Sequence, residues 1–242
     1  MLGVGRNMNR LYTILSFMIL FASCKSKNHH SDCMEYGYIG KVKKIVKSTN
    51  KVTSTYIKQS PETSSESSTN TYFINKDGNI DSLINEITLS TGEMYTYTQK
   101  FQFENSKRKN WVAHSLTKEK IMSGSINWLT DKKYEEKVLY PDGNLNFITT
   151  TFLNENFRIL KILITRLDES GKTIQNSMQE FDISKSGDIN SVSTTNLLDN
   201  IKEEKKYKYL DKDSMGNPTE ILVTKQNDKS RSIITLQYQY YK

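Results

Sequence analysis

The sequence predicts an all-β protein, an antiparallel meander of hairpins that forms one large curved or twisted sheet, of which a half-barrel is one form. Aromatic and apolar residues recur at every second position in several segments, as at Tyr95, Tyr97, Phe101 and Phe103. This period places them on one face of a strand. Glycine-containing turns separate these segments, and such turns join neighbouring antiparallel strands. Helical spacing is weak, and its best candidate, residues 196–206, is equally a loop that leads into a strand.

The first element is an export signal over residues 1–23. Arg10 precedes an apolar run at residues 11–22, which is shorter than the roughly 20 residues that a membrane-spanning helix needs. Two small residues directly precede Cys24. This layout resembles the lipobox of bacterial lipoproteins, although Phe21 stands where that family usually has Leu. The resemblance implies that Cys24 is acylated, with palmitate-like chains, and anchors the protein to a membrane. The alternative is an ordinary cleaved secretory signal.

Residues 24–35 are polar and lack any period, and we expect them to form a flexible tether. Cys33 lies there without a second cysteine to pair with and is interpreted as incidental. His29 and His30 are adjacent, and neighbouring residues of an extended chain point in opposite directions. A solvated pair is therefore the preferred interpretation, and the sequence predicts neither a metal site nor a cofactor.

Residues 36–242 are predicted to form a single antiparallel β domain. Within it, residues 59–70 are rich in Ser and Thr, and we expect a mobile surface loop there. Hairpin turns require a positive φ that glycine adopts freely. The structural turn glycines predicted on this basis are Gly78, Gly143, Gly171, Gly187 and Gly216, with further turns at Gly92 and Gly124. Because Gly37 lies beside the tether, Gly143→Val is expected to destabilise the domain more than Gly37→Val.

Aromatic residues alternate near the C-terminus on either side of a glycine turn, at residues 207–211, 216–218 and 238–241. This arrangement resembles the YD-repeat (Rhs-like) segments of Bacteroidetes-type lipoproteins of unknown function. The match is degenerate, because more residues separate Asp211 from Gly216 than the motif has. The resemblance implies a β-hairpin scaffold and no particular chemistry.

The charge pattern argues against a nucleic-acid partner. The chain has 34 Lys and Arg against 27 Asp and Glu, a formal charge of +7, but the lysines are scattered and form no Arg-rich stripe. Nucleophile elbows, phosphate-binding loops, HExxH and CxxC motifs are all absent from the sequence. His114 follows Trp111 in an expected strand and is interpreted as a partly buried structural residue. The sequence therefore predicts no catalytic residue.

The predicted function is a lipid-anchored binding or structural module of the cell envelope, with a protein, glycan or lipid partner. The residues after Cys24 lack the acidic cluster of a surface-export tag, which favours an outer-membrane position that faces the periplasm. One alternative is a carrier of an apolar ligand, which would show a large apolar cavity between sheet and lid. Another is a hydrolase of cell-wall or glycan material, which would show a cleft with convergent polar groups and shifted pKa values.

Overall fold

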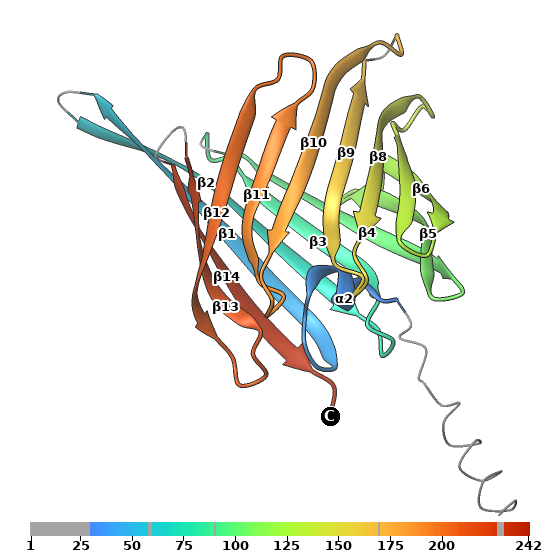
Figure 1. The fold of residues 1–242 in the computed structure, drawn as a ribbon. Helices are drawn as coiled ribbons and strands as arrows, with labels where there is room; N and C mark the ends of the chain where they lie inside the picture. The colour runs from blue at the N-terminus through green and yellow to red at the C-terminus, as the bar shows by residue number, and fades with distance from the viewer. Residues whose placement is uncertain (1–29, 58–59, 90, 169, 227–229) are drawn as a thin grey trace, which may run out of the picture.

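The computed structural model describes residues 30–57, 60–89, 91–168, 170–226 and 230–242. Fourteen strands and one short helix, α2 (Asp32–Tyr36), make up this part of the chain (Figure 1). The strands are β1 (Val42–Ile57), β2 (Ser60–Ile74), β3 (Ile80–Thr88), β4 (Met94–Glu104), β5 (Lys107–Ser115), β6 (Lys120–Thr130), β7 (Lys133–Leu139), β8 (Leu145–Leu153), β9 (Ile159–Leu167), β10 (Thr173–Ile183), β11 (Ile189–Asn196), β12 (Lys202–Lys212), β13 (Pro218–Lys225) and β14 (Arg231–Tyr240). None of the helical structure in these ranges is long and apolar enough to cross a membrane.

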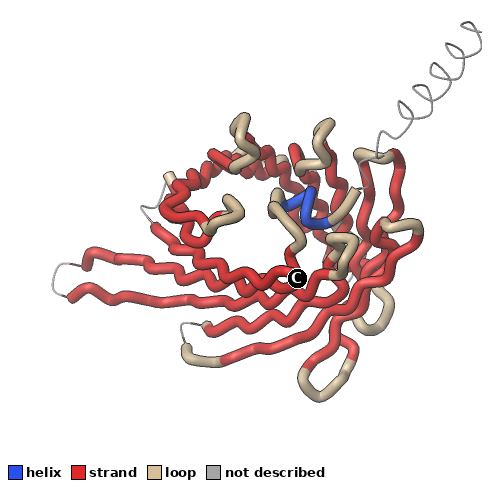
Figure 2. The backbone as a smooth tube through the Cα atoms, turned by 90° about the horizontal axis from the view of Figure 1, so that it is seen from below, coloured by secondary structure: helices blue, strands red, loops and turns tan. Residues whose placement is uncertain are grey.

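Each strand pairs antiparallel with the next one along the chain, and β14 returns to pair with β1. The predicted all-β antiparallel meander is therefore confirmed, but the sheet closes into a barrel instead of ending as an open sheet or half-barrel. The closing pair runs from Val42 opposite Tyr240 to Val52 opposite Arg231. Figure 2 shows the ring of strands from below, with α2 inside its outline.

Most turns between the strands share one geometry. At residues 140–144, the Tyr140 N–H donates to the Asn144 carbonyl at 2.8 Å and the Gly143 N–H donates to the Tyr140 carbonyl at 3.0 Å. This is a three-residue loop that ends in a left-handed residue, and Gly143 has a φ of 91°. All five predicted turn glycines occupy turns with positive φ. Lys118 and Phe157 take the same conformation without being glycine, with φ of 65° and 59°.

Two local expectations are wrong. Residues 60–70 belong to β2 and pair with β1, because Ser and Thr suit a strand whenever a neighbouring strand supplies its hydrogen bonds. Gly124 lies inside β6 and not in a turn; a Cβ there would come within 2.2 Å of Trp111 Nε1, so the glycine makes room for an indole. Of the two alternatives left open for residues 196–206, the structure has the loop that leads into a strand, because residues 197–201 form a turn before β12.

The alternation along the strands separates an inner from an outer face. Ile45 is opposite Tyr238 on one side and Tyr72 on the other, and all three pack in one apolar cluster with Cys33 of α2. Because α2 lies within the ring, this is the inner face. A second inner cluster on β5 to β8 is centred on Trp111. Burying one such side chain as fully as Ile45 contributes about 1.5–3 kcal/mol, so the inner face holds the barrel together.

Residues 30–35 also differ from the expected tether. They include most of α2, and the side chains of His30, Asp32, Cys33 and Glu35 are buried. Gly37, expected at a fraying end, is the left-handed residue that ends this helix, and a Cβ on it would overlap the Arg158 guanidinium. The segment of residues 30–38 therefore lies inside one end of the barrel, and we call it the plug.

Candidate functional site

Short-range signals start and end the helix of the plug. The Met34 N–H donates to Ser31 Oγ at 3.4 Å, and the Gly37 N–H donates to the Met34 carbonyl at 3.2 Å. These are N-cap and C-cap roles typical of Ser and Gly. The Cys33 N–H donates to the Gly78 carbonyl at 3.0 Å, which ties the helix to the β2–β3 turn.

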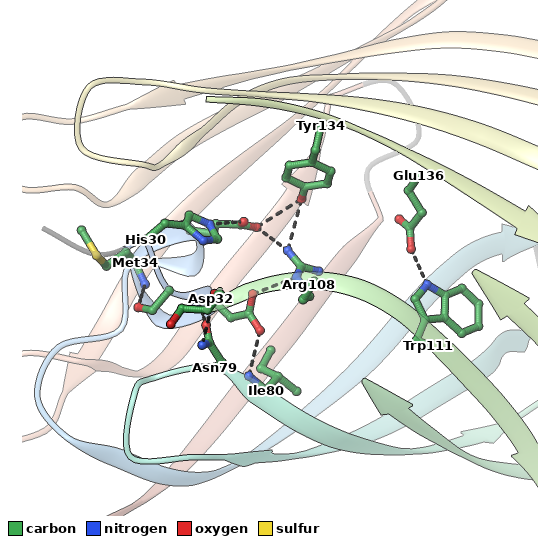
Figure 3. A network of polar contacts seen from close by, with 12 residues as sticks. His30, Asp32, Met34, Asn79, Ile80, Arg108, Trp111, Tyr134 and Glu136 are labelled. Atoms are coloured by element: carbon green, nitrogen blue, oxygen red, sulfur yellow. Dashed lines mark hydrogen bonds and ion pairs between the residues drawn. The ribbon is translucent and has the colours of Figure 1, made fainter. Parts of the chain in front are cut away.

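A buried ionic network fixes the plug to the barrel wall (Figure 3). Arg108 of β5 lies between two carboxylates of α2, with its Nε 2.8 Å from Asp32 Oδ1 and its Nη2 2.7 Å from Glu35 Oε2. The other oxygen of Asp32 accepts the Ile80 N–H at 2.8 Å. The side chains of Asp32 and Glu35 have no exposed surface and that of Arg108 is 9% exposed. Each charge is therefore compensated by a partner and not by water.

Two aromatic-ring residues complete the network. His30 Nε2 lies 2.6 Å from Glu35 Oε1, and its ring packs against Trp128 with 4.7 Å between centroids. The Tyr134 hydroxyl donates to Glu35 Oε2 at 3.2 Å. The expectation of a solvated histidine at position 30 is wrong, because a carboxylate and an aromatic wall that are distant in the sequence enclose it.

The pKa shifts in the plug follow from burial and from these pairs. Burial alone would raise the pKa of Glu35, but the charge of Arg108 and the contact with His30 outweigh it, so the pKa is lowered. Burial raises the pKa of Asp32, which Arg108 only partly offsets. Burial and the neighbouring Asp32 raise the pKa of the Cys33 thiol to about 12, so the thiol stays protonated and unreactive at neutral pH. The two buried carboxylates pair with Arg108, and Glu35 also pairs with His30, so the network holds the plug in place against the barrel wall.

Two adjoining cavities lie inside the barrel beyond the plug. The first, about 140 Å³, is bounded by Tyr36, Gly37 and Tyr38 of the plug and by apolar residues of β13 and β14. The second, about 410 Å³, extends along the inner faces of β12 and β13 towards Ser230, at the opposite end of the barrel. Both are lined by Lys47, Tyr207 and Ile234, so these residues mark the junction between the two cavities. We call this combined space the lumen.

Lys47 is a basic residue that lines both cavities of the lumen. It is an inner-face residue of β1, opposite Leu236 on one side and Asn70 on the other. Burial lowers its pKa, and no charged neighbour contributes to the shift. Within the ranges that the structure describes, no hydrogen bond or ion pair engages its ammonium group. By contrast, Glu136 of the inner face of β7 accepts hydrogen bonds from the Trp111 indole N–H and, at 3.5 Å, from the Thr149 hydroxyl.

The structure separates the residues that the sequence singled out. Cys24 and His29 lie outside the described residues. Gly78, Gly187 and Gly216 form turns at the plugged end, whereas Gly143 and Gly171 form turns at the other end. His114 lies in β5 and is half-buried. In the described segments no group of three or more His, Cys, Asp and Glu could hold a metal ion.

Sequence reasoning missed the plug residues and Lys47. Ser31 and Gly37, with the five residues of α2 between them, were the available start and stop signals for this helix. Lys47 shares its parity with Ile45 on a strand, which was the available signal that it points inward.

No model of a known protein family matches the chain, and no curated protein matches it. Among solved structures, it is similar to a porin-like protein from Bacteroides uniformis, with 13% identity and a TM-score of 0.45 over 82% of this chain and 96% of that one. A porin-like protein from Bacteroides vulgatus has 13% sequence identity and a TM-score of 0.46, over 78% of this chain and 97% of that one. A LolA superfamily protein from Nitrosomonas europaea has 11% sequence identity and a TM-score of 0.30, over 84% of this chain and 87% of that one.

Proposed function

We propose that this protein is a lipid-anchored binding protein of the cell envelope that holds a small, largely apolar molecule inside its barrel. The observation that carries the proposal is the lumen, a pair of joined cavities beneath a locked plug. Their volumes of about 140 and 410 Å³ together fall within the roughly 300–1,000 Å³ of small-molecule sites. This corresponds to the carrier alternative of the sequence analysis and not to a module that binds with an outer sheet face.

The contrast between the two faces of the barrel supports this assignment. Glu135 and Lys137 lie on the outer face of β7, and Glu204 and Lys206 lie on the outer face of β12. On the inner faces of these strands, Tyr134, Val138 and Tyr207 belong to the apolar clusters, whereas Glu136 and Lys205 are charged. Charges in the middle of outer faces suit contact with water, whereas a lipid-facing barrel carries an outer apolar band. An apolar ligand therefore finds its complementary surface in the lumen.

The proposed anchor sets the orientation of the lumen. Six residue steps separate Cys24 from His30 in the plug, and an extended chain spans at most about 3.5 Å per step. If Cys24 carries the lipid, the plugged end lies within about 20 Å of the bilayer and the second cavity faces away from it. Replacing Cys24 with Ala and following labelled palmitate tests the anchor. The lipid anchor would be contradicted if the Cys24→Ala variant still sedimented with membranes and the wild type took up no labelled palmitate.

A pair of neighbouring residues offers a test of the lumen. Ile234 points inward and is 9% exposed, whereas Ile233 points outward and is 40% exposed. The neutral dye N-phenyl-1-naphthylamine becomes fluorescent in apolar surroundings. We expect the wild type and Ile233→Trp to bind it, and Ile234→Trp to bind it at least about tenfold more weakly, because an indole fills the junction.

Thermal unfolding of both variants serves as the folding control. Equal dye binding by the two variants, or no dye binding by the wild type, would contradict a ligand site in the lumen.

A further inference from the structure

We propose that the lumen selects amphipathic ligands with an anionic head group, and that Lys47 binds this head while the apolar part lies against β13 and β14. This inference rests on the proposed binding function of the lumen and adds the chemical class of its ligand. It starts from one observation: Lys47 lines both cavities, and none of the residues that the structure describes places an opposite charge beside its ammonium group.

The other charged groups of the lumen differ from Lys47 in their surroundings. Lys225 Nζ lies 3.0 Å from Glu203 Oε1, so these two residues of the second cavity compensate each other. Arg158 lines the first cavity beside Asp188, and burial lowers its pKa because the nearby Tyr209 and Asp188 offset the burial only in part. Lys205 is exposed and accessible to water. Lys47 differs from Arg158 in its position at the junction of the two cavities, and no described residue supplies a counter-charge to it.

The surroundings of Lys47 are asymmetric along the lumen. On the plugged side, the first cavity presents Ile221, Ile234 and Leu236. On the other side, the second cavity presents Thr49 and Ser232, which are hydroxyl residues. A ligand with an apolar chain directed to the plug would place its head beside the ammonium group. A charge-assisted contact in such a water-poor site is stronger than a neutral one.

Decanoate and 1-decanol have the same chain length and differ in the charge of the head, which makes them suitable probes. Their displacement of N-phenyl-1-naphthylamine would be measured for the wild type, Lys47→Met, Lys47→Arg and Lys44→Met. Lys44 is the matched control, because it lies on the same strand with its ammonium 5.6 Å from the Phe73 ring on the outer face.

We expect the wild type to bind decanoate at least about tenfold more tightly than 1-decanol, since a hydrogen bond to a charged group contributes at least this factor. Lys47→Met should lose this preference while it still binds 1-decanol, which shows that its lumen is intact. Lys47→Arg and Lys44→Met should keep the preference.

Equal affinities for the two probes in the wild type, or an unchanged preference in Lys47→Met, would overturn the anionic selectivity and leave the lumen as a site for neutral ligands. A wild type that binds neither the dye nor either probe would overturn the proposed function itself.

Discussion

The plugged end and the lumen both place charged groups on the inner face of the same barrel, but they treat them in opposite ways. At the plug, Arg108 has Asp32 and Glu35 within 2.8 Å. In the lumen, Lys47 lies at the junction of the two cavities and lacks such a partner in the described ranges. A buried charge that is paired fixes geometry, whereas one that is unpaired lowers stability. The first arrangement suits a structural lock, and the second suits a site that a ligand completes.

The largest expected effect tests the lock. Arg108→Met removes the shared cation and leaves Asp32 and Glu35 buried without it, so we expect a loss of about 3–5 kcal/mol in the free energy of unfolding. Urea denaturation measures this loss. Adding Asp32→Asn and Glu35→Gln to the same variant removes the uncompensated charges and should recover part of the stability. An Arg108→Met protein as stable as the wild type would show that the network does not hold the plug.

The next effect compares a glycine of the plug with a glycine of the opposite end. Gly37 and Gly143 both have positive φ, of 74° and 91°, where a side chain costs about 1–2 kcal/mol. A Cβ at Gly37 would also displace the Arg158 guanidinium, whereas at Gly143 it would meet nothing within 4 Å. We expect Gly37→Val to lower the melting temperature more than Gly143→Val, the reverse of the order that the sequence suggested. Equal melting temperatures would mean that Arg158 moves aside freely.

Local signals explain how much of the fold was predictable. The period of two and the glycine turns act between neighbouring residues, so the antiparallel meander could be predicted from the sequence. The closure of the barrel could not, because it depends on β1 pairing with β14 from the far end of the chain. The same holds for β2, where Ser and Thr resemble a loop until β1 provides a partner.

The candidate site was less predictable than the fold. Asp32 and Glu35 resemble solvated residues of a tether, and their partner Arg108 is more than 70 positions away from them. Their burial follows from a tertiary contact that no local pattern encodes. Lys47 differs, because its strand parity with Ile45 and Thr49 already placed a cation on an apolar face. The degenerate YD-like aromatics Tyr207 and Tyr238 pack in the inner apolar cluster, and their relation to that repeat remains a prediction.

A smaller effect of opposite sign tests the unpaired charge. Because Lys47 lowers stability in the absence of a ligand, Lys47→Met should raise the free energy of unfolding by about 1 kcal/mol at neutral pH. Its folded-state pKa lies below the ordinary 10.5, so the penalty is complete below the folded pKa and fades as the pH rises towards 10.5. Urea denaturation of both proteins between pH 7 and about pH 10 measures this difference. A destabilised Lys47→Met protein would indicate that the ammonium has a structural partner.

The smallest effect concerns a charge pair on the outer face. Lys206 Nζ lies 3.9 Å from Glu204 Oε2, and the lysine side chain is 63% exposed, so water screens the attraction. We expect Lys206→Met to change the free energy of unfolding by less than about 0.5 kcal/mol, in clear contrast with Arg108→Met. A double-mutant cycle with Glu204→Gln isolates the pairwise contribution, which should be near zero at about 0.15 M salt. A coupling energy larger than about 1 kcal/mol between Lys206 and Glu204 would show that an exposed ion pair also stabilises the barrel. Burial would then not be what distinguishes the ion pairs of the plug from those of the outer face.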